Sequence, residues 1–389
     1  MRYMQHIPYF RHVFCTVLLI SSHSLSGTPR FKGQASASLA ANSRNDQFLG
    51  VRYIPSVEVT RQGPGPWQWD GLFTFNGYAD WQGQQWRFQD NGCDITPYRV
   101  WIRLASDRFG IRAGKQKINF GPAQLIRPLM WFDSLDPRDP LQMTDGVYAV
   151  LARYYFLNNA NLWLWGLYGN DRIKGLEMMP TSKYKTEYGG RFQHPLGPGE
   201  IGLTFHHRIV SGDISLAEFV VPELPPDFSV GAFPENRYAV DGRWDHVIGF
   251  WFEASLTHQD KAILPVRFMK MMTIGGDYTF SAGNGLYVQA EHFFLRSSYE
   301  LTGHDEGADL SALAVRYPVS LLDNLNVIFY YDWNHSDLYC FASWQRQYDR
   351  WSFYFMGFCN PEQFNLIQFQ TARSLFLGRG FQVMAVFNH

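Results

Sequence analysis

The stretch "YRVWIRLA", residues 98–105, alternates between two kinds of side chain along its length. Apolar and aromatic residues occupy the even positions from 98 to 104, whereas Arg99 and Arg103 occupy odd positions. A period of two places the two sets on opposite faces of a β-strand. The stretch therefore predicts a strand with one apolar face and one basic face.

The same alternation recurs along the chain. Further examples are "EIGLTFHHRIV" (200–210), "HVIGFWFEASLTH" (246–258), "NLNVIFYYDW" (324–333) and "RWSFYFMGF" (350–358). About eighteen such segments lie between residues 31 and 388. Alternate gaps between them are mostly short, and the intervening gaps are mostly long: 82–96, 117–146, 170–185, 211–234, 259–269, 298–307 and 361–378.

This sorting of gap lengths decides between two classes of β protein. A soluble β-sandwich also alternates, but it has no reason to place long loops at every second connection. An outer-membrane barrel carries short periplasmic turns at one end and long extracellular loops at the other, and its closure pairs every backbone group without water. We therefore expect an all-β fold, a transmembrane antiparallel up-and-down β-barrel of about 18 strands, with 16 as the alternative.

The composition agrees with this class. Aromatic residues make up 17% of the chain, and they cluster at predicted strand ends, as interfacial girdles do; ordinary core aromatics are the alternative. The net charge of −1 gives nucleic acid no basic footprint. Four cysteines without a CxxC or Cys/His spacing predict no metal site, and no cofactor is required.

The N-terminus predicts export. Arg2 and Arg11 precede the apolar run 13–20 and the small residues that end at Gly27, which is the pattern of a secretory signal peptide. We expect residues 1–27 to be this signal and 28–389 to be the mature barrel, in the bacterial outer membrane; a buried helix is the alternative reading. The mature part contains no apolar run long enough for a transmembrane helix.

Two parts of the sequence resemble known families. The last segment, "GRGFQVMAVFNH", is similar to the terminal signal that the outer-membrane assembly machinery recognises, although Phe387 is third from the end. The whole mature chain resembles bacterial outer-membrane porins, and "IRAGKQKINFG" (111–121), running into a long loop, is similar to the alginate-export and phosphate-selective porins. That resemblance implies a monomer or homotrimer surrounded by outer-membrane lipids, passing small anionic solutes or an acidic polysaccharide.

One gap differs from the others. "INFGPAQLIRPLMWFDSLDPRDPLQMTDG", residues 118–146, contains four prolines and an apolar run that a solvated loop would not need. Proline restricts φ and lowers the entropy lost on ordering. We expect residues 117–146 to be the third extracellular loop, folded into the lumen; an external loop packed on its neighbours is the alternative.

Ionisable residues on the polar faces are the candidate site, because charges facing lipid cost about 2–4 kcal/mol at mid-depth. Arginines outnumber acids there, which favours anions; a neutral lumen that selects by size is the alternative. The predicted pore-lining residues are Arg99, Arg103, Arg112, Lys117, Arg127, Asp133, Asp136, Arg138, Arg191, Arg208, Arg243, Glu253 and Arg316.

We expect a channel rather than an enzyme. No Gly-x-Ser-x-Gly or His-Glu-x-x-His motif is present, and the adjacent His206 and His207 point to opposite faces. A barrel enzyme of the lipase or protease type and a non-conducting surface or adhesive barrel remain the alternatives.

Two local predictions complete the sequence reading. A turn centred between Asp349 and Arg350 places Cys340 opposite Cys359, within disulfide range. We therefore expect a disulfide between them, with two buried apolar cysteines as the alternative. Asn360, Pro361 and Gly378 suit the cap, first position and exit of a helix at the start of 361–378, with strand extension as the alternative.

Overall fold

The computed structural model describes residues 29–85, 87–212, 231–263, 266–303, 306–362 and 376–389. Within these ranges, no helix has the length and apolar character needed to cross a membrane. The predicted signal peptide, 1–27, lies outside the described residues, as does most of the helix predicted after Asn360.

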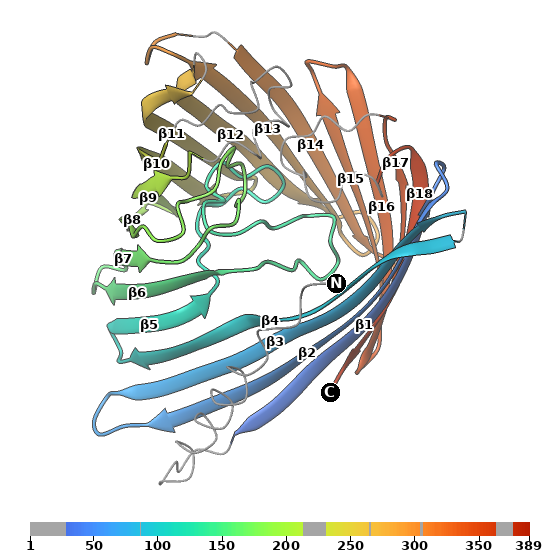
Figure 1. Cartoon of the computed structure of the whole chain (residues 1–389), viewed down its shortest axis with the longest axis horizontal. Helices are drawn as coiled ribbons and strands as arrows, with labels where there is room; N and C mark the ends of the chain where they lie inside the picture. Colours follow the sequence, from blue (N-terminus) through green and yellow to red (C-terminus); the bar gives the residue numbers. More distant parts are fainter. Residues whose placement is uncertain (1–28, 86, 213–230, 264–265, 304–305, 363–375) are drawn as a thin grey trace.

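The described chain consists of strands joined by turns and loops. The strands are β1 (Arg30–Asn42), β2 (Asp46–Gln62), β3 (Gln68–Gln84), β4 (Arg87–Ala105), β5 (Phe109–Gln116), β6 (Val147–Tyr155), β7 (Asn161–Leu167), β8 (Glu187–Leu196), β9 (Gly199–Val210), β10 (Phe233–Asp245), β11 (Gly249–Ile263), β12 (Val266–Phe280), β13 (Leu286–Ser298), β14 (Glu306–Pro318), β15 (Asp323–Asp332), β16 (Asp337–Gln347), β17 (Trp351–Cys359) and β18 (Arg379–Asn388). Each pairs antiparallel with its sequence neighbours, and β1 closes the ring with β18 (Figure 1). The predicted fold class, a closed 18-stranded antiparallel barrel, is confirmed.

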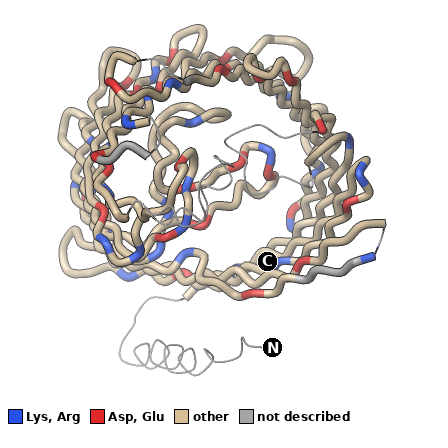
Figure 2. The backbone as a smooth tube through the Cα atoms, turned by 45° about the horizontal axis from the view of Figure 1, so that its top comes forward, with Lys and Arg blue, Asp and Glu red and all other residues tan. Residues whose placement is uncertain are grey.

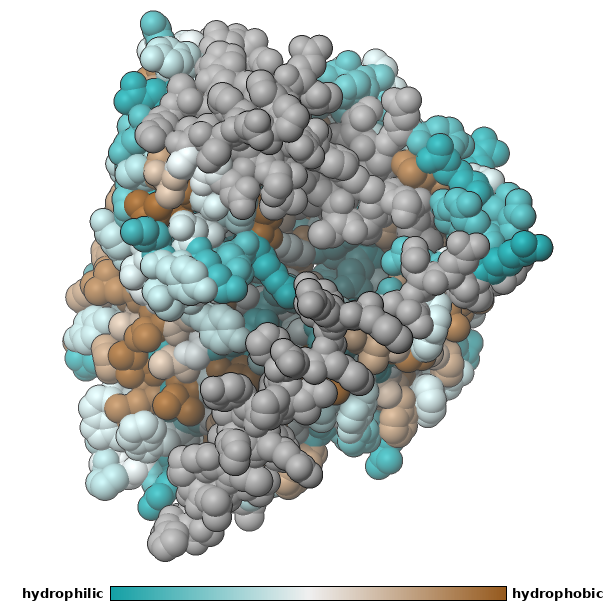
Figure 3. Space-filling model, in the orientation of Figure 1, coloured by the Kyte–Doolittle hydropathy of each residue, from teal (hydrophilic) through white to brown (hydrophobic). Residues whose placement is uncertain are grey.

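Two of the predicted long loops are wrong. Strands β3 and β4 continue to the pair Gln84↔Arg87, so that most of 82–96 is a hairpin, and β11 and β12 continue to Ile263↔Val266. Backbone pairing does not require apolar side chains where a hairpin stands in water. The hydrophilic β3–β4 hairpin therefore stays paired although it projects beyond its neighbours (Figures 1 and 3).

The two ends of the barrel differ. One end, here called the short-turn end, carries only tight turns such as 106–108, 246–248 and 319–322. The other, the loop end, carries the long connections 117–146, 168–186, 211–232 and 360–378 together with several tight turns. The loop end therefore supplies the chain that enters the barrel.

The outer face of the barrel is apolar. Large hydrophobic side chains exposed at alternate positions include Val51, Tyr53, Ile102, Val150, Leu164, Phe192, Leu203, Phe250, Leu313, Phe355 and Val383. Apolar residues gather on the outer wall that Figure 3 shows. A barrel that spans a membrane presents such a surface to lipid.

The cysteine register is as predicted, because Cys340 lies directly opposite Cys359 on the β16–β17 hairpin. The structure nevertheless has both as free thiols, with Cys359 exposed, which does not support the predicted disulfide. We expect thiol labelling of the unfolded, non-reduced protein to decide between the two states. Labelling of both cysteines in the non-reduced protein would show that they are not joined. Protection of both until a reductant is added would show that the disulfide forms.

Candidate functional site

Residues 117–146 run through the interior of the barrel, as Figures 1 and 2 show. Their apolar side packs on the inward faces of the wall. Ile118, Phe120, Leu129, Trp131 and Phe132 form one cluster with inward residues of β6 and β7. Leu125 and Ile126 join a second cluster on β12 to β17. The segment, here called the inner segment, thus fills a hydrophobic gap between opposite parts of the wall.

Two wall carboxylates hold the backbone of the inner segment. Glu253 on β11 accepts the amide N–H groups of Ala123 and Leu129 at 2.9 and 3.0 Å. Glu291 on β13 accepts those of residues 124–126 at 2.8–3.0 Å. Carboxyl oxygens accept hydrogen bonds from amide N–H groups whether the acid is ionised or protonated. Five amides, four of them in buried residues, are therefore satisfied by the wall.

The strand between these carboxylates adds another contact. Thr273 on β12 donates its hydroxyl to the carbonyl of Ile126 at 2.8 Å. Gly121 has a φ of +88°, and a Cβ there would collide with the Glu253 carboxylate. Only glycine lets the chain approach Glu253 in this conformation.

The returning arm of the inner segment is held by Arg99 on β4. Its guanidinium donates to the carbonyl and hydroxyl of Thr144 at 2.7 and 2.8 Å, and to the carbonyl of Asp145 at 3.0 Å. Arg99 is only 9% exposed. Its role in the structure is therefore to fasten the inner segment.

The tip of the inner segment reaches the opposite wall through Arg138. This side chain is bonded to Asp136 and lies over the rings of Phe341 and Phe376, at 5.0 and 4.8 Å. Desolvated cation–π contacts of this kind are worth about 2 kcal/mol. The tip is thus anchored rather than loose.

Charges within the inner segment are also paired. Arg127 donates to Asn119 and to the carbonyl of Phe120, and its guanidinium lies 3.9 Å from the Asp133 carboxylate. Burial raises the pKa of the Asp133 carboxyl, and the positive charges of Arg127 and Lys117 oppose this rise. The pair stabilises the fold of the segment and does not face open lumen.

A second stretch from the loop end, residues 174–181, joins a buried ion network. The Glu177 carboxylate lies 3.1 Å from Arg208 and 3.0 Å from Arg237, and Glu235 binds the same two arginines. Arg191 forms a two-point pair with Asp241. The positive charges of these arginines are therefore balanced by buried carboxylates.

These contacts correct the expected role of several predicted residues. Arg99, Arg127, Asp133, Arg138, Arg191, Arg208 and Glu253 all belong to the barrel interior or the inner segment, but each is at most 9% exposed and contacts protein instead of lining an open pore. Sequence alternation gives the face of a strand and cannot show what covers that face.

The other predicted residues are at least partly open. Arg103, Arg112, Arg243 and Arg316 face inward toward the short-turn end, and Lys117 and Asp136 lie on the inner segment. Arg52 on β2 and Arg153 on β6 also face inward and are absent from the predicted set. The alternation of "VYAVLARYY" carried the signal for Arg153, because it shares the parity of buried Val147, Ala149 and Leu151.

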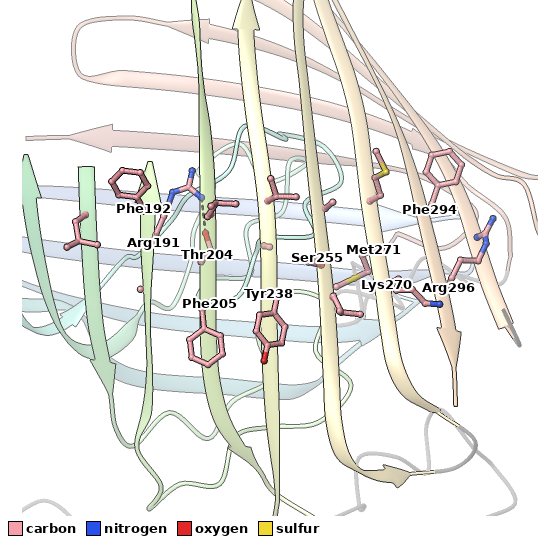
Figure 4. A pocket seen from close by; sticks show the side chains of 18 residues that line it. Arg191, Phe192, Thr204, Phe205, Tyr238, Ser255, Lys270, Met271, Phe294 and Arg296 are labelled. Atoms are coloured by element: carbon pink, nitrogen blue, oxygen red, sulfur yellow. Dashed lines mark hydrogen bonds between the residues drawn. The ribbon is translucent and has the colours of Figure 1, made fainter. Parts of the chain in front are cut away.

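A large surface hollow lies outside the lumen. It has a volume of about 840 Å³ and is lined mainly by outward side chains of β8 to β13, among them Phe192, Tyr238, Leu256 and Phe294 (Figure 4). Lys270 and Arg296 stand at its margin. Its position on the apolar wall makes it a lipid-facing depression rather than a solute path.

The described residues contain no group of three His, Cys, Asp or Glu side chains placed to hold a metal ion. His206 is fully buried: Trp165 donates to its Nδ1 at 3.2 Å, and its Nε2 lies 3.3 Å from Glu187. Both ring nitrogens therefore have protein partners.

No family model and no curated protein matches the sequence. Solved structures share the fold. OccAB4 of Acinetobacter baumannii is 5% identical, with a TM-score of 0.57 over 94% of this chain and 100% of that one. OccAB1 of the same organism is 9% identical, with a TM-score of 0.55 over 93% and 96%. Wzi, described as a carbohydrate-binding barrel involved in group 1 capsule assembly in Escherichia coli, is 12% identical, with a TM-score of 0.53 over 99% and 89%.

At these identities the likeness shows the fold alone, a porin-like barrel of the outer-membrane type. None of these three structures points to the alginate-export or phosphate-selective porins in particular.

Proposed function

We propose that the protein is an outer-membrane channel for small polar solutes, with a preference for anions and no catalytic role. The observation that carries the proposal is the anchoring of the inner segment by Glu253 and Glu291. An ordered segment held across a barrel this wide narrows the lumen to a fixed cross-section. The apolar outer face supports residence in a membrane.

The inward arginines that have no carboxylate partner favour anions over cations in the lumen. The acids of the covered wall are taken by arginines or by backbone amides, as described for Glu235, Asp241 and Glu253. By contrast, Arg112, Arg153 and Arg316 have no carboxylate within ion-pair distance in the described part of the chain. Guanidinium groups remain charged at any physiological pH. An acidic polysaccharide, as in alginate-export porins, is a narrower version of the same proposal.

A non-conducting barrel is the second candidate, because the inner segment and residues 174–181 both lie inside the barrel. Single-channel recording of the purified protein in planar bilayers separates the two. We expect discrete conductance steps, and a reversal potential in a KCl gradient that has the sign of chloride preference. A folded barrel that inserts without steps would favour the non-conducting reading.

Arg112→Glu is expected to move the reversal potential toward cation preference. The substitution changes the lumen charge by two units at a position where Arg103 and Arg153 are the like charges acting on Arg112. Reversal potentials of both proteins in the same KCl gradient measure the effect. Lys115→Glu on the outward face of the same strand makes an equal charge change and should shift the potential less.

A further inference from the structure

Three arginines and a tryptophan meet on the inward face of β4 to β7. Arg103 is directly opposite Arg112 across β4 and β5. Arg153 is opposite Gly110 across β5 and β6, and opposite Trp163 across β6 and β7. Directly opposed residues have Cα atoms about 4.5–5.5 Å apart, so the four side chains form one group near the short-turn end.

The group carries more positive than negative charge. Asp70 is the carboxylate beside it, and this carboxylate is bonded to Arg103 at 2.6 and 2.9 Å and to Gln68 at 2.7 Å. The charges acting on Arg112 are the like charges of Arg153 and Arg103 and, more weakly, Asp70. Two guanidinium groups, those of Arg112 and Arg153, are left without their own counter-charge among the described residues.

Aromatic rings hold these two guanidinium groups in place. Arg112 lies over the ring of Trp101 at 4.7 Å, and Arg153 lies over the ring of Trp163 at 3.6 Å. Stacking fixes the plane of a guanidinium while its N–H edge stays available. The donors are therefore oriented before any solute arrives, which lowers the entropy lost on binding.

Donors at this place lack acceptors. The Nε atoms of Arg112 and Arg153 and the Nε1 atom of Trp163 are shielded by the protein, yet none has a hydrogen-bond acceptor in the described part of the chain. Polar groups in such positions are nearly always hydrogen-bonded, and leaving them unpaired is costly. Arg112 and Arg153 are themselves only partly buried, so a solute rich in acceptors can reach the unshielded parts of their guanidinium groups.

We infer that Arg103, Arg112, Arg153 and Trp163 form a binding site for an oxyanion, a carboxylate or a phosphate group carried by the solute. Carboxylate and phosphate oxygens match the two-point geometry of guanidinium, whereas a halide has no such fork. The inference rests on the proposed channel function and adds to it a saturable site, so that oxyanions bind during passage instead of only being attracted.

Block of the chloride current tests this site. Sodium glucuronate and inorganic phosphate are the two probes, and glucose is the uncharged control, each added to channels in planar bilayers. We expect a concentration-dependent reduction of current with one or both oxyanions and none with glucose. Block by glucuronate alone identifies a carboxylate site, and block by phosphate alone identifies a phosphate site.

Substitutions locate the block. Arg112→Gln and Arg153→Gln are each expected to weaken it about tenfold, the effect of losing one charge-assisted hydrogen-bonding group. Arg316→Gln removes the same charge from β14, where Arg316 lies over Tyr287, and should change the block less than about twofold. An equal loss in all three variants would show a diffuse field and overturn the site, as would the absence of block in wild-type channels.

Calorimetry separates this inference from the proposed function. Titrating glucuronate or phosphate into the detergent-solubilised barrel measures binding without conductance. Binding of an oxyanion without conductance steps would support the site and contradict the channel function. Conductance steps without binding or block would support the channel function and contradict the site. If a glutamine variant fails to fold, Arg112→Lys keeps the charge but removes the fork, and it should still weaken binding.

Discussion

Deleting residues 122–140, with a short Gly-Ser linker between Gly121 and Leu141, is expected to raise the single-channel conductance severalfold. The deleted stretch carries the apolar run that packs on β12 to β17 and the tip residue Arg138. Its removal also frees Glu253 and Glu291, which then become hydrated charges in a wider lumen. Conductance of a channel grows with the cross-section of its narrowest part.

The measurement is the conductance of wild-type and deleted barrels in the same salt. Far-ultraviolet circular dichroism, and the mobility shift that heating produces in folded barrels, show whether the deleted protein assembles. An assembled variant with unchanged conductance and selectivity would mean that the inner segment does not set the narrowest point. The same result would show that Glu253 and Glu291, once uncovered by the deletion, do not affect the conductance.

The strands were predictable because each depends on local alternation. β5 and β9 end, and β6 and β18 begin, at the edges of the predicted gaps 117–146, 211–234 and 361–378. Every predicted inward arginine on a strand faces inward, because parity is conserved along a strand and across each register pair. The error at 82–96 arose where polar residues continued a hairpin, since hydropathy does not mark strands that stand in water on both faces. The error at 259–269 does not have this cause, because residues 262–266 are apolar.

The site was less predictable, for a physical reason. Whether an inward arginine meets water or protein depends on where the inner segment lies, and its anchors are remote in sequence. The bond from Leu129 to Glu253 joins residues 124 positions apart, and the bond from Gln124 to Glu291 joins residues 167 positions apart. Arg208 and Arg112 have the same pattern in their strands, yet the first is buried in an ion network and the second remains without a carboxylate partner.

Glu291→Ala is expected to release the inner segment from the wall. The substitution leaves three amide groups, those of residues 124–126, without acceptors in a buried position. Leaving a buried donor unpaired costs about 1–3 kcal/mol, so the seating of the segment should weaken by several kcal/mol, an upper bound because water enters the gap. The barrel itself should stay folded, because its ladder does not depend on this side chain.

Limited digestion with trypsin measures the release. Arg138 is 5% exposed in the seated segment, and we expect cleavage after Arg138 to become much faster in Glu291→Ala, together with larger fluctuations of the open-channel current. Glu291→Gln keeps an acceptor oxygen but loses the charge, and it should fall between the wild type and Glu291→Ala. Glu58→Ala is the matched control, because Glu58 on β2 is partly exposed and forms an ion pair with the surface residue Lys32. Equal resistance at Arg138 in Glu291→Ala and Glu58→Ala would show that apolar packing alone holds the inner segment, and that the wall glutamates add nothing to its seating.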